Sequence, residues 1–599
     1  MLSLLKASGT SLGRRVHACA LLDAYPVCTV NALGQTTQEA YYGVAGSTKP
    51  ACPTGNGGAA WVAGGGLVAA AFFGQLQAER DANGQLTTYT YDQWGRPAGV
   101  WRPGDAGGSA TQVTTYSSQL QGGQELITPP FDIGHQQRID LGGAGTPTYQ
   151  YSWTFYDGFG QAIQTQTQTQ DGYNDPAVVS TGYDAFGHVL TQTMPFTGTG
   201  SGGNYQYLSA LPPLKTYAYD SLGRTTSATN ADGTAVRYTY SGQSTISCDE
   251  DSHRKDQILD GLGRLVQVVE YPNGTCSAPG SPATTTYSYN AADQLTGVTD
   301  AANDVTSITY NALGEKIAMT DPDLGHWSYG YDAAGNLTSQ TDARGQTVCS
   351  YYDGLNRPEG KYYLSGGGSC PTAAPGYNVV YAYDHGTNGI GRVTAAGASA
   401  AGGLSQSNVC STASGSNCTG WIYDARGRVL TEGRGFADYL SGTAFSTNHT
   451  YDDADRVIST TYPSNPDSGY AETVSTSYSG RGLPLSLTSS AQGTLVDAAS
   501  YDMAGRLLGE SFPAGGNLAR TQGFYPWTEQ GGALKSLLVA PPGGASPVLD
   551  MSYGYDAVGN LLSLTDLTAG GAPTSGAMQK AGAKSGFRTV IECNGRLAR

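Results

Sequence analysis

Four tyrosines, Tyr289, Tyr310, Tyr331 and Tyr352, follow one another at a constant spacing of 21 residues. Each is followed by Asn or Asp, and a Thr-Asp step recurs in the same phase between them, for example at 320–321. A fixed period of this length is typical of repeated supersecondary units that stack on their neighbours. We therefore expect a repeat array rather than several independent domains.

One unit predicts two strands and two turns. Tyr329 and Tyr331 are two residues apart, so they share one face of a strand. Residues 332–335, Asp-Ala-Ala-Gly, fit a type I turn, because Asp accepts local main-chain bonds and Gly tolerates a positive φ. Residues 336–341 form the return strand and residues 342–345 the second turn. Since no stretch shows a capped 3.6-residue apolar period, the unit is expected to be a β-meander.

The motif Tyr-(Asp/Asn)-x-x-Gly recurs over most of the chain. We take its residues as structural, at Tyr91, Asp92, Gly95, Tyr183, Asp184, Gly187, Tyr219, Asp220, Gly223, Tyr310, Asn311, Gly314, Tyr331, Asp332, Gly335, Tyr352, Asp353, Tyr555, Asp556 and Gly559. The expected divisions are an irregular segment or truncated repeat at 1–29, the repeat array at 30–570 and an atypical tail at 571–599. Gly- and Ser-rich inserts at 196–213, 241–256, 272–283, 363–376 and 395–418 are expected to be loops at strand ends.

Composition agrees with a thin wall. The chain has 85 Gly and 40 Tyr but only 12 Phe, and 13% of its residues are charged. Tyr must supply much of the buried area, and its hydroxyl needs a partner or water. One hairpin cannot bury its apolar face alone, whereas many in series can if the sheet coils on itself. The predicted fold is all-β, with 21-residue hairpin repeats coiling into a curved or hollow β-shell, which we expect to be a partial shell.

The charge pattern excludes two classes of partner. The net charge is −16, and Lys and Arg do not cluster, so we expect no nucleic-acid binding. No run of about 18 apolar residues occurs, so we expect no membrane-spanning helix. The segment before residue 30 makes no convincing signal peptide.

Ten cysteines include three successive pairs that could form local disulfides: Cys248 with Cys276, Cys349 with Cys370, and Cys410 with Cys418. Unpaired, partly buried thiols are the alternative, because connectivity cannot be deduced from sequence. No CxxC pair occurs, and no histidines have metal-ligand spacing, so neither a metal nor a cofactor is expected.

Catalytic patterns have structural explanations here. The abundant carboxylates occupy one turn position, which favours a structural role over acid–base work on sugars. Residues 249–251, Asp-Glu-Asp, are interpreted as a solvated loop rather than a calcium site. The string Gly-Thr-Ser-Leu-Gly at 9–13 lacks the α/β context that a nucleophile elbow requires. We expect the chain not to be an enzyme.

Several strings carry a family resemblance, among them YDAFGHVL (183–190), YDSLGRTT (219–226), DGLGRLVQ (260–267), YDAAGNLTSQTDARG (331–345) and YDMAGRLL (501–508). They resemble the YD repeats of RHS proteins, of insecticidal toxin-complex B/C components and of the teneurin YD shell. In that family the repeats spiral into a hollow shell that holds a C-terminal toxin, often after an Asp-Pro-x-Gly self-cleavage motif. Residues 321–325 resemble that motif only superficially, because they lie in phase with ordinary repeat turns.

The resemblance implies a bacterial protein that is secreted or at the cell surface. Its expected function is to encapsulate or present a C-terminal toxin or effector in intercellular competition. The expected partners are that cargo or neighbouring shell segments of a longer RHS protein. The alternative is a cell-surface adhesin whose exposed tyrosines bind carbohydrate or protein, although even spacing favours tyrosines that fill a cross-strand ladder.

Overall fold

The computed structural model describes most of the chain. The described residues are 17–18, 21–22, 25–26, 28–41, 75–105, 109–117, 119–121, 124–126, 130–140, 147–169, 172–208, 210–364, 366, 368–399, 402–406, 417–435, 444–464, 469–544 and 546–568. The expected tail at 571–599, most of the expected segment at 1–29, residues 9–13 and Cys410 lie outside them.

One antiparallel sheet of 36 strands dominates the described residues. Its strands are β1 (His17–Ala18), β4 (Cys28–Val30), β5 (Thr36–Tyr41), β6 (Leu76–Arg80), β7 (Leu86–Tyr91), β8 (Pro97–Trp101), β9 (Gln112–Tyr116), β12 (Phe131–Arg138), β13 (Tyr149–Tyr156), β14 (Ala162–Thr169), β15 (Gly172–Tyr183), β16 (Val189–Thr193), β17 (Phe196–Thr197), β18 (Leu214–Tyr219), β19 (Thr225–Thr229), β20 (Ala235–Ser241), β21 (Ser244–Cys248), β22 (Arg254–Leu259), β23 (Leu265–Glu270), β24 (Ala283–Tyr289), β25 (Leu295–Thr299), β26 (Val305–Tyr310), β27 (Lys316–Asp321), β28 (Gly325–Tyr331), β29 (Leu337–Thr341), β30 (Thr347–Tyr352), β31 (Pro358–Leu364), β32 (Val379–Tyr383), β33 (Val393–Ala398), β34 (Asn417–Tyr423), β35 (Val429–Gly435), β36 (Ala444–Tyr451), β37 (Val457–Thr461), β38 (Thr473–Tyr478), β39 (Pro484–Ser489) and β40 (Gly493–Val496).

A second antiparallel sheet of six strands continues the meander. It contains β41 (Ala499–Tyr501), β42 (Leu507–Phe512), β43 (Leu518–Phe524), β44 (Leu534–Ala540), β45 (Leu549–Tyr555) and β46 (Leu561–Asp566). Two isolated ribbons pair β2 (Leu21–Leu22) with β3 (Tyr25–Pro26) and β10 (Gln119–Gln121) with β11 (Gln124–Leu126). The helical elements described are the short 3-10 turns η3 (Pro513–Gly515) and η4 (Gln530–Gly532). The predicted all-β hairpin array is confirmed.

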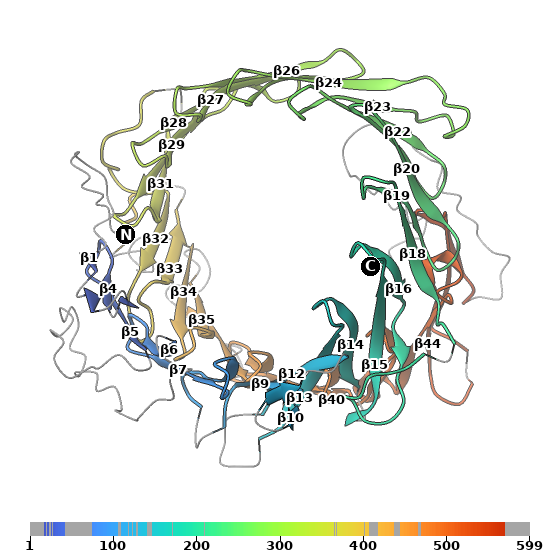
Figure 1. Cartoon of the computed structure of the whole chain (residues 1–599). Helices are drawn as coiled ribbons and strands as arrows, with labels where there is room; N and C mark the ends of the chain where they lie inside the picture. The colour runs from blue at the N-terminus through green and yellow to red at the C-terminus, as the bar shows by residue number, and fades with distance from the viewer. Residues whose placement is uncertain are drawn as a thin grey trace.

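The sheet curls into a ring and overlaps itself (Figure 1). Strands β4 to β31 form the first coil, and β32 to β46 run beside it as a second coil. The hairpins stand across the wall, so each coil has two rims. We call the turn after each repeat tyrosine a YD turn, and the turn at the other end of the hairpin an opposite turn. Each coil therefore has a YD rim and an opposite rim.

The wall is one sheet thick, and side chains alternate between its two faces. In β26 the exposed residues Val305, Ser307 and Thr309 alternate with the half-buried Thr306, Ile308 and Tyr310. Deeply buried apolar residues are few in the described chain, and one small cluster joins Val380, Ala382 and Leu404. Tyr rings and polar contacts therefore supply much of the stabilisation that a conventional apolar core would provide.

One predicted insert is wrong. The Gly, Ser and Asp content of 241–256 suggested a loop, but the segment contains β21 and the start of β22, which pair with each other and with β20. Gly242 has φ +58 and closes a tight hairpin between Ser241 and Ser244. The β-branched residues that follow then form a strand, so composition alone misled the prediction.

The insert at 196–213 folds back over the sheet. Two fully buried glutamines of β14 bind its main chain: Gln166 donates to the carbonyl of Asn204 at 2.7 Å, and Gln164 to that of Gln206 at 3.0 Å. The amides of Gly203 and Gln206 donate back to the same two side chains. Buried polar groups are thus paired, as burial requires.

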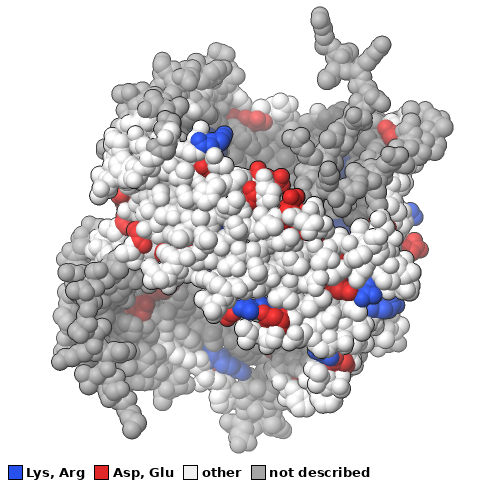
Figure 2. All heavy atoms as spheres, turned by 90° about the horizontal axis from the view of Figure 1, so that it is seen from above, with Lys and Arg blue, Asp and Glu red and all other residues white. Residues whose placement is uncertain are grey.

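Charged side chains are sparse on one outer face of the wall (Figure 2). Figure 2 shows a mostly uncharged face on which acidic and basic residues lie in small groups. Among the described residues, no helix is long and apolar enough to cross a membrane.

Candidate functional site

The YD turns share one hydrogen-bonding scheme. In the turn 332–336, Oδ1 of Asp332 accepts main-chain N–H bonds from Ala334 and Asn336, both at 2.9 Å. The same scheme holds at the other predicted positions Asp92, Asp184, Asp220, Asn311 and Asp353, and Asp556 accepts from the amide of Asn560. These side chains thus hold the turns together through main-chain hydrogen bonds.

The glycine of the turn makes a bulge. Gly335 has φ +83, and its N–H donates to the carbonyl of Asp332 at 3.1 Å. The strand register shifts at Gly330/Tyr331, which places one extra residue in the hairpin. Type I turns followed by a left-handed Gly bulge twist in the sense that sheets prefer. The predicted Gly95, Gly187, Gly223, Gly314 and Gly559 have φ between +75 and +88.

Each repeat tyrosine ties its hairpin to the preceding one. The hydroxyl of Tyr331 donates to the carbonyl of Lys316 at 3.0 Å, and Tyr352 donates in the same way to Leu337 at 2.9 Å. Equivalent bonds join Tyr91 to Leu76, Tyr183 to Ala162, Tyr219 to Val189 and Tyr310 to Leu295. Burial raises the pKa of Tyr331 and Tyr352. The tyrosines therefore form a ladder of hydroxyl-to-carbonyl bonds along the wall.

An arginine at the fifth position of many YD turns completes the contact. Nε of Arg224 donates to Oδ2 of Asp220 at 2.7 Å, and the guanidinium lies 4.2 Å from the ring centroid of Tyr240 in the next hairpin. The same arrangement joins Arg264 to Asp260 and Tyr289, Arg357 to Asp353 and Tyr383, Arg428 to Asp424 and Tyr451, and Arg456 to Asp452 and Tyr478. Bonds from Arg224 hold the pKa of Asp220 below its usual range.

These contacts engage the hydroxyls and several ring faces of the tyrosines that could have stacked on sugars. Their hydroxyls bind main-chain carbonyls, and cations cover several ring faces. Cation–π and hydrogen-bond contacts of this kind each contribute about 0.5–1.5 kcal/mol, and they repeat along the wall. The described geometry favours the cross-strand ladder over carbohydrate binding.

The two coils meet along a seam, where the opposite rim of the first coil contacts the YD rim of the second. In three opposite turns of the first coil, the third residue is Asn or Asp. Its side-chain oxygen accepts an N–H bond from the second coil in each case: Asn83 from Ile390 at 2.8 Å, Asp232 from Gly531 at 2.7 Å and Asp251 from Ala557 at 3.2 Å. These partners are 307, 299 and 306 residues apart, which sets the length of one coil. Residues 249–251, expected to be a solvated loop, are therefore partly a seam contact.

A buried ion-pair network lies in the middle of the seam. Arg426 of the second coil bonds to Asp105 of the first at 2.8 Å and to Asp453 at 2.6 Å. Arg138 of the first coil pairs with Asp140 at 2.6 Å and reaches Asp453 at 3.2 Å. The side chains of Arg426 and Asp105 are 6% and 1% exposed. Because a lone buried charge is costly, each coil needs the other to satisfy this network.

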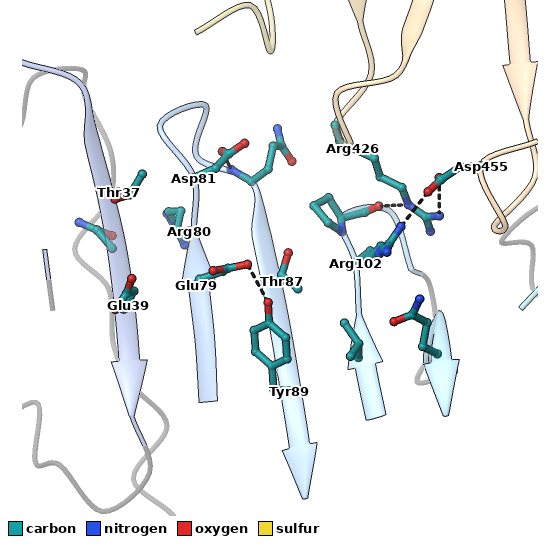
Figure 3. A pocket seen from close by; sticks show the side chains of 16 residues that line it. Thr37, Glu39, Glu79, Arg80, Asp81, Thr87, Tyr89, Arg102, Arg426 and Asp455 are labelled. Carbon is teal, nitrogen blue, oxygen red and sulfur yellow. Dashed lines mark hydrogen bonds and ion pairs between the residues drawn. The ribbon is translucent and has the colours of Figure 1, made fainter. Parts of the chain in front are cut away.

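A polar hollow of about 620 Å³ adjoins the seam (Figure 3). Glu79 on β6 accepts a bond from the hydroxyl of Tyr89 on β7 at 2.7 Å. Burial and this bond raise the pKa of Tyr89. On the other side, Arg102 pairs with Asp455 of the second coil at 2.7 Å. The hollow is polar and shared between the coils.

Disulfides join Cys248 to Cys276 and Cys349 to Cys370. Cys418 lies in β34, and its expected partner Cys410 lies outside the described residues. Within the described part of the chain, no three His, Cys, Asp or Glu side chains are grouped so that they could hold a metal ion.

The family model of the RHS repeat matches residues 73–100 and, in overlapping windows, residues 260–305, 289–326, 310–347 and 331–361. The later windows cover the block whose tyrosines are spaced by 21 residues. The chain contains RHS repeats. No protein of curated function matches the sequence.

The RHS chain is similar to solved toxin-complex structures. It matches the crystal structure of TcdB2-TccC3-Cdc42 with a TM-score of 0.70 and 14% identity, over 90% of the RHS chain and 30% of the matched chain. For the crystal structure of TcdB2-TccC3 the values are 0.69, 16%, 90% and 28%. For the Photorhabdus luminescens Tc holotoxin pore they are 0.71, 14%, 91% and 30%. The RHS chain thus shares their fold and spans under a third of their length.

Two features of the RHS wall were not predicted from the sequence. The arginine at the fifth turn position was visible in strings such as YDSLGR and DGLGR, and its recurrence beside Asp could have indicated the ion pair. The seam contacts had no local signal, because their partners lie about 300 residues apart.

Proposed function

We propose that this chain is a wall segment of an RHS shell that encloses a C-terminal polypeptide cargo, a toxin or effector, in a secreted or cell-surface bacterial protein. The observation that carries the proposal is the two-coil spiral around a central space, sealed by a buried seam (Figure 1). The shared fold with TcdB2-TccC3 supports it.

The proposed mechanism is confinement. A chain held inside a wall can neither gather its native contacts nor reach its substrates. The wall must then resist opening, and two devices serve this end: the tyrosine ladder along each coil and the seam between coils. In this proposal the chain supplies no catalysis, and its turn carboxylates act as structural acceptors.

The proposal is tested by attaching cargo. The full chain is extended at its C-terminus with a small reporter domain, and its digestion by a nonspecific protease is followed beside that of the free reporter. We expect the attached reporter to be cut more slowly and to show reduced activity, because it is enclosed and kept from folding. Equal rates of digestion with full reporter activity would overturn the proposal.

A matched pair of variants separates enclosure from attachment. Arg426→Ala breaks the buried seam, whereas Arg434→Ala removes an arginine that is 61% exposed and pairs with Glu432. Loss of reporter protection in the first variant alone would tie protection to the closed seam.

A further inference from the structure

Two rims remain uncovered in the described structure. The seam covers the YD rim of the second coil with part of the opposite rim of the first. The YD rim of the first coil and the opposite rim of the second coil face away from it. Both rims have the curvature of the same ring (Figure 1).

The uncovered YD rim of the first coil carries a row of large apolar side chains. They occupy the third position of five YD turns: Phe159 is 93% exposed and Phe186 87%, while Leu222, Leu262 and Leu313 are between 74% and 79% exposed; Ala292 has this position in the turn between the last two. The turn scheme uses only the main-chain N–H of this position, so it does not require an apolar residue.

The same position is filled differently in the seam. The YD turns of the second coil place Arg426 and Ala454 there, and Arg426 is buried against the first coil. The covered YD rim has Arg, Ala and, in the turn after β45, Val558 at this position, whereas five turns of the uncovered rim expose Phe or Leu to solvent. Aligned apolar side chains of this size mark an interaction surface.

The uncovered opposite rim of the second coil also exposes apolar groups. Tyr462, next to the end of β37, is 48% exposed, and Val548, just before β45, is 61% exposed. Tyr470, whose hydroxyl bonds to Ser490, is 46% exposed on the same rim. The two uncovered rims are therefore similar in chemistry.

We propose that the YD rim of the first coil docks the opposite rim of a second coil supplied by a second copy of this chain. The seam within the chain already joins a YD rim to an opposite rim, so the contact continues an established interface in the same orientation. The contact is head to tail, and because it uses two different surfaces it leaves one of each free and can add further copies. The inference extends the proposed shell role, since stacked copies would lengthen the wall.

The test is self-association of the full chain, measured by sedimentation velocity over a wide range of concentration. We expect the chain to form species larger than a monomer as concentration rises. The variant Phe159→Ser/Phe186→Ser/Leu222→Ser should weaken association by roughly 1,000-fold, since each of the three buried apolar side chains contributes about tenfold or more. These residues are exposed, so the monomer should stay folded. Leu211→Ser is the matched control, because Leu211 is 73% exposed but lies in the connection before β18, at the end of that strand away from its YD turn and so on neither uncovered rim.

Mixing variants tests the head-to-tail geometry. The triple variant keeps its opposite rim, and Tyr462→Ser/Val548→Ser keeps its YD rim. Each alone should be monomeric, but together they should form a one-to-one dimer that grows no further. A wild-type chain that stays monomeric, association that survives both sets of changes, or binding of the rim to phosphatidylcholine vesicles without self-association would overturn the inference. Reporter protection is measured at concentrations where the chain is monomeric, so the shell role can hold or fail independently.

Discussion

The tyrosine ladder predicts a sharp difference between two tyrosines on the same strand. Tyr331 donates its hydroxyl to the carbonyl of Lys316 at 3.0 Å. Tyr329 lies two residues earlier on the same face, and its hydroxyl makes no hydrogen bond to any described residue. Tyr331→Phe removes the donor and leaves the Lys316 carbonyl without it, which should cost about 1–2 kcal/mol. Tyr329→Phe should cost close to nothing.

Hydrogen exchange of the native chain is the suitable assay, because a long repeat array need not unfold in a single step. Amides of β27 and β28 should exchange roughly 5–30 times faster in Tyr331→Phe, the factor that corresponds to 1–2 kcal/mol. Amides in distant hairpins should be unchanged. Equal acceleration in both variants, or none in Tyr331→Phe, would refute the ladder as a stabilising device.

Three further predictions concern the seam and the turns. Arg426→Ala leaves Asp105 buried without its cation and should destabilise the seam by about 3–5 kcal/mol, whereas Arg434→Ala should cost less than about 1 kcal/mol; urea-dependent hydrogen exchange at the seam turns measures both. The interactions that depress the pKa of Asp220 stabilise its turn above the ordinary Asp pKa of about 3.9, and this stabilisation is lost as pH falls through the depressed value; the protection factor of that turn, taken relative to the intrinsic exchange rate at each pH, should therefore fall toward pH 3 in the wild type, and less in Asp220→Asn. Gly335→Ala forces a side chain to adopt φ +83 and should cost about 1–2 kcal/mol, seen as faster local exchange.

Local features of the fold were predictable because they repeat within 21 residues. Asp332 and Gly335 indicate a turn, and the spacing of Tyr329 and Tyr331 indicates one face of a strand. The partner of the Tyr331 hydroxyl was not predictable, since any main-chain carbonyl nearby could have accepted it. The segment 241–256 shows the opposite error, in which turn-rich composition hid a short strand.

The seam was beyond sequence reasoning for a different reason. Asn83 and Asp232 look like ordinary turn residues, and nothing near them marks a partner about 300 residues away. Which surfaces meet depends on the accumulated curvature of more than twenty strands. Phe159 and Phe186 likewise look like tolerated turn residues until the ring shows that they share one uncovered rim.

The central claim is that the repeats wind into overlapping coils. Spin labels at Gln85 and Asn388 test this claim by pulsed electron paramagnetic resonance. In the spiral, Nε2 of Gln85 donates to Oδ1 of Asn388 across the seam at 2.8 Å. Overlapping coils predict a short, narrow distance distribution at the lower limit of the method. A flat sheet would separate the two sites by roughly 100 Å, at about 4.8 Å per strand. A long or broad distribution would contradict the spiral and, with it, the shell.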